Sequence, residues 1–323
     1  MRAVVCRSYG TPDDLVLDDL PDPTPGPGQV VVGVRAAGVN FPDVLLIAGK
    51  YQIKIPVPFI PGSELAGEVV AVGDGAPFRP GQRVSATTPT GAFAERALLD
   101  AGAVTPVPDD VDFASAAAFG VTYRTAHHAL RSVADVRQGD WVVVLGAAGG
   151  VGLAAVDLAV AMGARVLAAA SSPEKLALCR RRGAAAAVDY EREDLKSRIR
   201  ELTGDSARVI LDPVGGPHSE PALRGLARGG TFVTLGYAAG GIPAIPLNLV
   251  LLKGITVRGM EIRTFTADRP DDAARDMREL AGMFAAGTIR PYIGARFPLG
   301  ETAAALRHVA ERMALGKVVI EVA

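Results

Sequence analysis

The chain has 323 residues, enough for two domains at about 150 residues each. Its 34 basic and 35 acidic residues leave a net charge of −1, so we expect no nucleic-acid partner, because nucleic-acid-binding proteins carry a basic face. Hydrophobic residues make up 49% of the chain and charged residues 21%, a composition that excludes a disordered protein.

The cysteine content argues against a secreted protein. Cys6 and Cys179 are the two cysteines of the chain, too few for a disulfide framework or for a zinc site of several thiolates. The first ten residues, MRAVVCRSYG, lack the apolar core of a signal peptide. We therefore expect a cytoplasmic protein.

Two uncharged stretches, 141–156 and 229–252, resemble membrane spans at first sight. The first contains four glycines, and the second contains five glycines together with Pro243 and Pro246. Glycine and proline at this density favour strands and turns over a spanning helix. We expect a buried strand followed by a loop in 229–252, and no membrane partner.

The first 120 residues predict a β-rich domain with few helices, because apolar runs alternate with dense proline and glycine. The expected strands are 29–37, 64–72 and 83–86. From residue 113 the pattern changes, beginning with an alanine-rich helix at 114–119.

From Trp141 onward short apolar runs alternate with helical segments. We expect strands at 142–145, 165–170, 185–189, 209–212 and 231–235, and helices at 150–162, 173–182, 194–202 and 219–226. Uninterrupted apolar strands between helices predict a parallel sheet covered on both faces. Helices at 271–286 and 301–313 and a strand at 317–322 end the chain.

A glycine-rich loop, GAAGGVG at 146–152, follows the first of these strands and opens a helix. The spacing fits G-x-G-x-x-G with Ala147 in the first glycine position, and the strand, loop, helix and second strand occur in the order of a dinucleotide-binding unit. The helix N-terminus would then face a pyrophosphate. The alternative is a tight turn that binds nothing. The predicted cofactor contacts here are Ala148, Gly149, Gly150, Val151 and Gly152.

The end of the second strand favours NADPH over NADH. NADH-binding proteins place a carboxylate about 20 residues along, on the ribose 2′-hydroxyl. Here Ser171, Ser172 and Lys175 occupy this region instead, and hydroxyls with a cation suit a 2′-phosphate. The same residues also fit a helix N-cap followed by a surface lysine, and both interpretations are compatible.

These motifs, with several others, resemble the medium-chain dehydrogenase/reductase superfamily, and more closely its zinc-independent quinone oxidoreductase branch of the zeta-crystallin type. The other matching segments are GVNFPD at 38–43, PGSELAG at 61–67, VTYRTA at 121–126, GDWVVV at 139–144, DPVGG at 212–216 and GKVV at 316–319. The resemblance implies an α/β fold, with a GroES-like β-rich catalytic domain (1–121 and 262–323) and an inserted Rossmann doubly wound parallel-sheet domain that binds NADPH (122–261).

The resemblance also predicts that no metal is used. The zinc alcohol dehydrogenases place zinc ligands at the positions of Asn40, Ser63 and residues 120–122, and none of these residues is a good zinc ligand here. His127 and His128 are neighbours on a predicted helix. Their side chains point about 100° apart, so they do not easily share one ion.

The resemblance assigns Asn40, Asp43 and Tyr51 to the catalytic pocket. The Asn40 amide could donate to a substrate carbonyl oxygen as hydride arrives, and Tyr51 could donate from its phenol. The alternatives are a capped turn at 40–43 and an ordinary loop aromatic at 51. Further cofactor contacts implied by the family are Thr125, Tyr190, Gly236, Tyr237 and Lys317.

We therefore expect an NADPH-dependent reductase that delivers hydride, or electrons, to a quinone. An enoyl-thioester or enone reductase on the same fold is the alternative, because a fold does not determine a substrate. A non-enzymatic cofactor-binding or RNA-binding role is a third reading, which the charge disfavours. The family also implies a homodimer formed through edge strands of the Rossmann sheet, here the segment 254–260.

Overall fold

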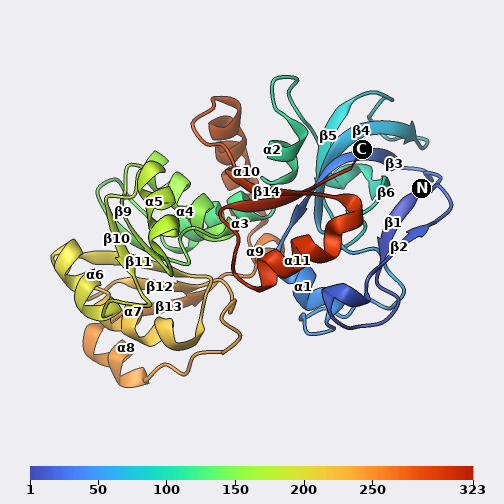
Figure 1. Ribbon diagram of the computed structural model, residues 1–323. Helices are drawn as coiled ribbons and strands as arrows, with labels where there is room; N and C mark the ends of the chain where they lie inside the picture. Colours follow the sequence, from blue (N-terminus) through green and yellow to red (C-terminus); the bar gives the residue numbers. More distant parts are fainter. Residues whose placement is uncertain (323) are drawn as a thin grey trace. The chain divides into compact units, whose positions relative to one another are not determined.

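The computed structural model describes residues 1–322 (Figure 1). The chain folds into two compact units. The first unit comprises Met1–Val121 and Pro291–Ala323, and the second comprises Thr122–Arg290. The first boundary coincides with the one expected from the sequence. The second lies at Pro291 rather than at residue 262.

Residues 262–290 belong to the second unit because their helices pack there. Helix α10 (Pro270–Ala285) contacts α3 (Thr122–His128) and the π-helical turn η3 (Ala129–Val133). The preceding helix, α9 (Ile262–Asp268), packs against α10. Residues 262–290 therefore lie in the second unit, whereas the resemblance implied that they belong to the catalytic domain.

A seven-stranded sheet forms the core of the first unit, in the order β14-β15-β3-β4-β5-β7, with β6 also paired to β3. The bounds are β3 (Gln29–Val39), β4 (Glu64–Val72), β5 (Arg83–Thr87), β6 (Arg96–Asp100), β7 (Val104–Pro106), β14 (Ile293–Pro298) and β15 (Lys317–Glu321). Within the described residues of this sheet, β14–β15 is the only parallel pair. Strand β15, near the C-terminus, pairs with β3, so both ends of the chain build one sheet.

Short elements complete the first unit. They are β1 (Arg2–Val5), β2 (Val16–Asp19), α1 (Phe41–Ile47), α2 (Phe113–Ala117), α11 (Thr302–Ala310) and the 3-10 turns η1 (Pro12–Asp14), η2 (Ala101–Ala103) and η5 (Leu299–Glu301). Helix α11 packs against α1 and against β14 and β15. The core between them contains Leu65, Phe93 and Ile320, which are fully buried.

The second unit is built on a six-stranded parallel sheet in the order β10-β9-β8-β11-β12-β13. Its strands are β8 (Trp141–Leu145), β9 (Arg165–Ala170), β10 (Ala186–Asp189), β11 (Ala207–Asp212), β12 (Thr231–Thr234) and β13 (Thr256–Gly259). The central strand β8 is buried along its whole length. This explains its uninterrupted apolar sequence, because helices cover both of its faces.

Besides α3, α9 and α10, the second unit has helices that lie on both faces of the sheet (Figure 1). They are α4 (Gly150–Ala161), α5 (Pro173–Arg181), α6 (Leu195–Thr203), α7 (Ser219–Gly225) and α8 (Leu247–Lys253), with the 3-10 turn η4 (Gly216–His218). Strand order reverses after β10, so right-handed crossovers place α4 and α5 on one face and α6 and α7 on the other. The sequence predicted all of these elements except α8 and η4.

Helix α8 corrects the expectation for residues 229–252. The expected strand is present as β12, but the end of the stretch is helical rather than a loop. Three of its leucines, Leu247, Leu251 and Leu252, are more than 60% exposed. Apolar composition indicated burial, yet these side chains are exposed to solvent. No helix among residues 1–322 is long and apolar enough to cross a membrane.

Candidate functional site

The loop between β8 and α4 has the geometry that a pyrophosphate-binding turn requires. Gly146 has a positive φ of 56°, and Gly149 lies at the N-cap of α4. A Cβ at Gly152 would lie 2.1 Å from the Gly146 carbonyl oxygen, so only glycine lets the helix start this close to the loop. The first helical turn, Gly150 to Gly152, has N–H groups without intrahelical acceptors, which suits an anion.

The end of β9 carries the helix N-cap that the sequence suggested. Ser172 caps α5, since its Oγ accepts a hydrogen bond from the Lys175 backbone N–H at 3.3 Å. The Lys175 Nζ in turn donates to Ser171 Oγ at 3.1 Å. All three side chains are half-buried. The cap fixes the helix start, and the lysine ammonium stays beside a hydroxyl at the end of the strand.

Tyr190 directly follows the neighbouring strand, β10. Asp189 pairs in register with Ala170, and the Tyr190 backbone N–H donates to the Ala170 carbonyl at 3.2 Å. The Tyr190 ring stacks against His218, with centroids 4.2 Å apart. The sequence did not single out His218. It stands two residues after the glycine pair in DPVGG and is unremarkable without the fold.

The remaining predicted contacts of the second unit lie elsewhere. Gly236 and Tyr237 follow β12, in a loop bonded to the loop after β11 through Ala238 N–H and the Pro213 carbonyl. Thr125 lies half-buried on α3. The residues that follow β8, β9, β10 and β12 all stand at the carboxyl edge of one parallel sheet, where ligands of this architecture bind.

In the first unit, Asn40 and Asp43 form the capped turn that opens α1. Asp43 Oδ2 accepts the Asn40 backbone N–H at 2.8 Å, and the Asp43 N–H donates to the Asn40 carbonyl at 3.0 Å. Both residues are buried. Tyr51 lies in the irregular segment after α1 and is half-buried.

The Asn40 amide is held by three partners from distant parts of the chain. Its Nδ2 donates to Glu64 Oε1 at 2.9 Å and to Ser63 Oγ at 3.4 Å. Its Oδ1 accepts from Lys317 Nζ at 2.7 Å. Lys317 Nζ also lies 2.5 Å from Glu64 Oε1, and both of these charged side chains are almost fully buried. The structure therefore gathers Asn40, Asp43 and Lys317 into one polar cluster, together with Ser63 and Glu64.

Asp43 has an unusual acidity within this cluster. Its complete burial raises the pKa to about 7. The hydrogen bond from the Asn40 N–H, the nearby Ser63 hydroxyl and the positive charge of Lys317 oppose this effect only in part. A carboxyl group with this pKa exchanges a proton near neutral pH.

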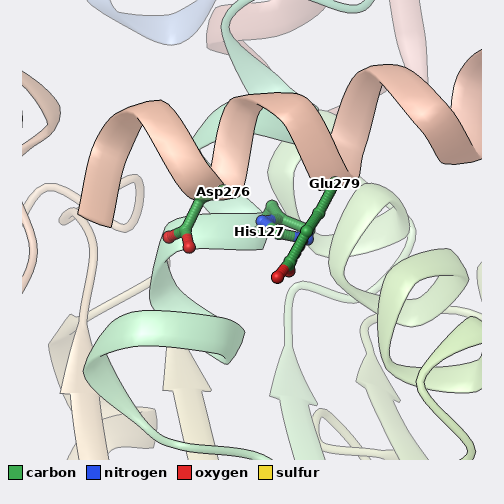
Figure 2. Close-up of side chains that lie close together, drawn as sticks. All are labelled: His127, Asp276 and Glu279. Carbon is green, nitrogen blue, oxygen red and sulfur yellow. Dashed lines mark ion pairs between the residues drawn. The ribbon is translucent and has the colours of Figure 1, made fainter. Parts of the chain in front are cut away.

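A second polar cluster lies between α3 and α10 (Figure 2). One donor atom from each of His127, Asp276 and Glu279 lies within 4.8 Å of the others. His127 Nε2 is 3.8 Å from Glu279 Oε2, and neither ring nitrogen of this fully buried histidine has a hydrogen-bond partner. His128 points instead to Asp276, with its Nδ1 at 2.9 Å from Oδ2. The two histidines diverge, as their adjacent positions on a helix require.

The carboxylates of this second cluster are already well satisfied. Besides His128, Asp276 accepts hydrogen bonds from Ser132 Oγ at 2.5 Å and from Arg275 Nη2 at 2.7 Å. Burial alone would raise the pKa of Asp276, but these hydrogen bonds outweigh it and hold the pKa below its ordinary value. Arg131 Nε donates to Glu279 at 3.1 Å. Because guanidinium groups already neutralise both acids, we interpret the cluster as a link between helices.

Comparison with known proteins adds to this geometry. Residues 26–109 match the alcohol dehydrogenase GroES-like domain family, and residues 150–281 match the zinc-binding dehydrogenase family. A quinone oxidoreductase-like protein 2 homolog of Nematostella vectensis is 38% identical over 99% of this chain and 88% of its own length. A quinone oxidoreductase of Pseudomonas aeruginosa is 37% identical over 99% of both chains.

Two solved structures show the same fold over nearly the whole chain. The Escherichia coli quinone oxidoreductase complexed with NADPH has a TM-score of 0.92 at 26% identity, covering 99% of this chain and 100% of the other. The Thermus thermophilus quinone oxidoreductase, solved also with NADPH, has a TM-score of 0.84 at 37% identity, with 99% and 100% covered. The predicted fold class, a GroES-like domain with an inserted Rossmann domain, is confirmed.

Proposed function

We propose that this chain, which belongs to the quinone oxidoreductase branch of the medium-chain dehydrogenase/reductase superfamily, reduces a quinone by hydride transfer from NADPH. The observation that carries the proposal is the end of β9. There a lysine and two serines stand where an NADH-binding protein places a carboxylate. The similarity to quinone oxidoreductases over the full chain supports the choice of acceptor.

The residues of the second unit fit the cofactor. Glycine at position 152 lets α4 start close against the loop, and the first turn of α4 can bind the pyrophosphate. Ser171 and Lys175, with Tyr190 on the next strand, would hold the 2′-phosphate. NADPH, when bound, supplies the hydride.

The cluster around Asn40 is proposed to serve the acceptor. Lys317 holds the amide oxygen of Asn40 and so directs its Nδ2 toward Ser63, where the hydrogen bond is long at 3.4 Å. A substrate carbonyl oxygen would take this donor as negative charge develops on it. Asp43 can hold a proton close by near neutral pH, and Tyr51 is the proposed phenol donor.

The same cluster supports hydride transfer without zinc. An amide, a hydroxyl and a carboxylate already paired with an ammonium group at 2.5 Å occupy this region. Zinc prefers thiolate, imidazole or unpaired carboxylate ligands, so this set of groups is a poor match.

The proposal also includes a homodimer in the cytoplasm. Strand β13 is an outer strand of the six-stranded sheet, and an open edge can pair with the same edge of a second copy. Exposed leucines of α8 add apolar surface to the same unit. Both cysteines are buried free thiols, in keeping with a reducing compartment.

The test is NADPH and NADH oxidation, followed in parallel with a simple benzoquinone as acceptor. We expect NADPH-selective turnover. The Lys175→Ala variant should raise the KM for NADPH by about 10-fold or more and leave the KM for NADH unchanged, because a charge-assisted hydrogen bond to the 2′-phosphate is lost. Arg180→Ala, which removes an exposed cation from the same helix, is the matched control.

Absence of quinone turnover with either cofactor would contradict the proposal. The same assay with an α,β-unsaturated thioester would then test the enoyl-thioester reductase alternative.

A further inference from the structure

His218 and Tyr190 connect two strand ends that are not neighbours in the sheet. Tyr190 follows β10 and His218 belongs to η4 after β11, and two strands, β9 and β8, lie between these in the sheet order. The two rings nevertheless contact each other, with centroids 4.2 Å apart and planes inclined by 37°. This contact spans the carboxyl edge at which the cofactor contacts are proposed.

The fold determines where His218 lies. Fully buried Asp212, the last residue of β11, accepts the backbone N–H groups of Val214 and Gly215, each at 2.8 Å, and the Ser219 hydroxyl at 2.5 Å. These bonds fix the turn on both sides of η4. The His218 side chain is only 16% exposed, and its Nε2 lies 3.9 Å from Glu191. The imidazole is therefore a built support for Tyr190 rather than a free surface group.

Tyr190 itself is tied to the proposed 2′-phosphate contacts. Its backbone N–H bonds to the carbonyl of Ala170, and the next residue along that strand is Ser171. Ser171 in turn accepts the Lys175 ammonium at 3.1 Å. The Tyr190 backbone is therefore fixed beside Ala170, the residue that precedes Ser171.

We infer that His218 is a positioning residue that sets the preference for NADPH over NADH by holding the Tyr190 ring at the 2′-phosphate subsite. The inference rests on the proposed function. A tyrosine ring without this support would sample other rotamers. Ordering the ring when the nucleotide binds would then cost conformational entropy and weaken the affinity. The 2′-phosphate should lose this contact, while the rest of the nucleotide keeps its own contacts on the glycine loop.

The experiment measures the affinities of 2′,5′-ADP and 5′-AMP for the full chain by titration calorimetry. In His218→Ala we expect binding of 2′,5′-ADP to weaken by about 3- to 10-fold, the effect of one mobile side chain, and 5′-AMP to change less than about 2-fold. His218→Phe keeps a ring against Tyr190 and should restore the wild-type ratio. His308→Ala is the matched control, because His308 packs on Phe297 in the first unit.

Three results would overturn the role of His218: an unchanged affinity ratio in His218→Ala, an equal loss for both nucleotides, or a loss that His218→Phe does not restore. Thermal melting checks that the variants fold, and His218→Gln replaces the alanine variant if that one does not. A wild-type chain that binds 2′,5′-ADP no more tightly than 5′-AMP would instead contradict the proposed NADPH preference itself.

Discussion

Lys317 and Glu64 show how a single buried pair organises the first unit. Their charges lie 2.5 Å apart with 3% and 1% of the side chains exposed. Removal of one partner from such a pair leaves an uncompensated buried charge, which costs about 3–5 kcal/mol. Here the pair also orients the Asn40 amide through hydrogen bonds to both of its ends. The charges therefore fix the direction of a proposed catalytic donor.

Asp43 gives a prediction about pH at the same scale. Its pKa is about 7 in the folded chain against an ordinary 3.8, so the folded chain binds more protons than the unfolded chain between these values. Stability contributed by this group is therefore lost as pH rises from about 4 to 7. The side chain in Asp43→Asn cannot ionise. The melting temperature of this variant minus that of wild type should therefore be larger at pH 8 than at pH 5, by at least about 2 °C.

Scanning calorimetry at the two pH values measures this difference. Asp110→Asn, which alters an exposed carboxylate in the same unit, is the control and should show no such dependence. An Asp43→Asn variant with equal effects at pH 5 and pH 8 would show that Asp43 is already ionised in the folded chain at the lower pH.

At the scale of elements, the close start of α4 against β8 shapes the proposed cofactor loop. The α4 helix begins after a turn in which the Gly149 N–H bonds to the Gly146 carbonyl at 3.0 Å. The same carbonyl oxygen is the atom that a Cβ at Gly152 would meet. The Gly146 carbonyl therefore determines both the turn and how closely α4 packs against the loop. The free N–H groups of the first turn of α4 lie next to this contact.

The matched pair Gly152→Ala and Gly282→Ala tests this contact. Both glycines lie in helices of the second unit, but a Cβ at Gly282 would have no heavy atom within 4 Å. Gly152→Ala should destabilise the chain by about 1–3 kcal/mol, as overpacking does, whereas Gly282→Ala should stabilise it by up to about 1 kcal/mol through helix propensity. Chemical denaturation reports both values. Equal signs for the two variants would contradict the argument.

At the scale of the whole molecule, the two units differ in how the chain builds them. The second unit is one continuous segment, whereas the first needs β14 and β15 from beyond residue 290 to finish its sheet. Strand β13 forms an open edge of the six-stranded sheet, and three leucines of α8 in the same unit are exposed. An unpaired strand edge and exposed apolar surface are features of a surface that binds another protein chain.

The proposed homodimer predicts the effect of a charge on this edge. Leu251, on α8, is 81% exposed, and Val257, on β13, is 42% exposed. Leu251→Lys combined with Val257→Lys should shift the protein from dimer to monomer in size-exclusion chromatography with light scattering. Leu98→Lys, at a 42% exposed position on β6, is the control and should remain dimeric. A monomeric wild-type chain would contradict the proposal.

The sequence by itself determined most strands of the second unit and the glycine loop, but it did not predict β1, β2, β6, β7 and β14 of the first unit. The bounds predicted for 64–72 and 165–170 coincide with those of β4 and β9, because apolar runs between turn residues are a local signal. The loop at 146–152 was equally predictable, since its glycines satisfy steric demands within one turn. The predicted site residues of the second unit follow from the same fact, as most of them stand directly after a strand.

Only the tertiary structure decided which distant residues meet. Lys317 and Glu64 are 253 residues apart in the chain, and His128 and Asp276 are 148 apart. Such pairs depend on sheet order and helix packing, which the hydrophobic periodicity of the sequence does not determine. For the same reason, the sequence did not place residues 262–290 in the second unit. It also did not predict the exposed leucines of α8 or the contact of His218 with Tyr190. Local patterns encode the elements, whereas the free energy of their packing selects the contacts that give the site its chemistry.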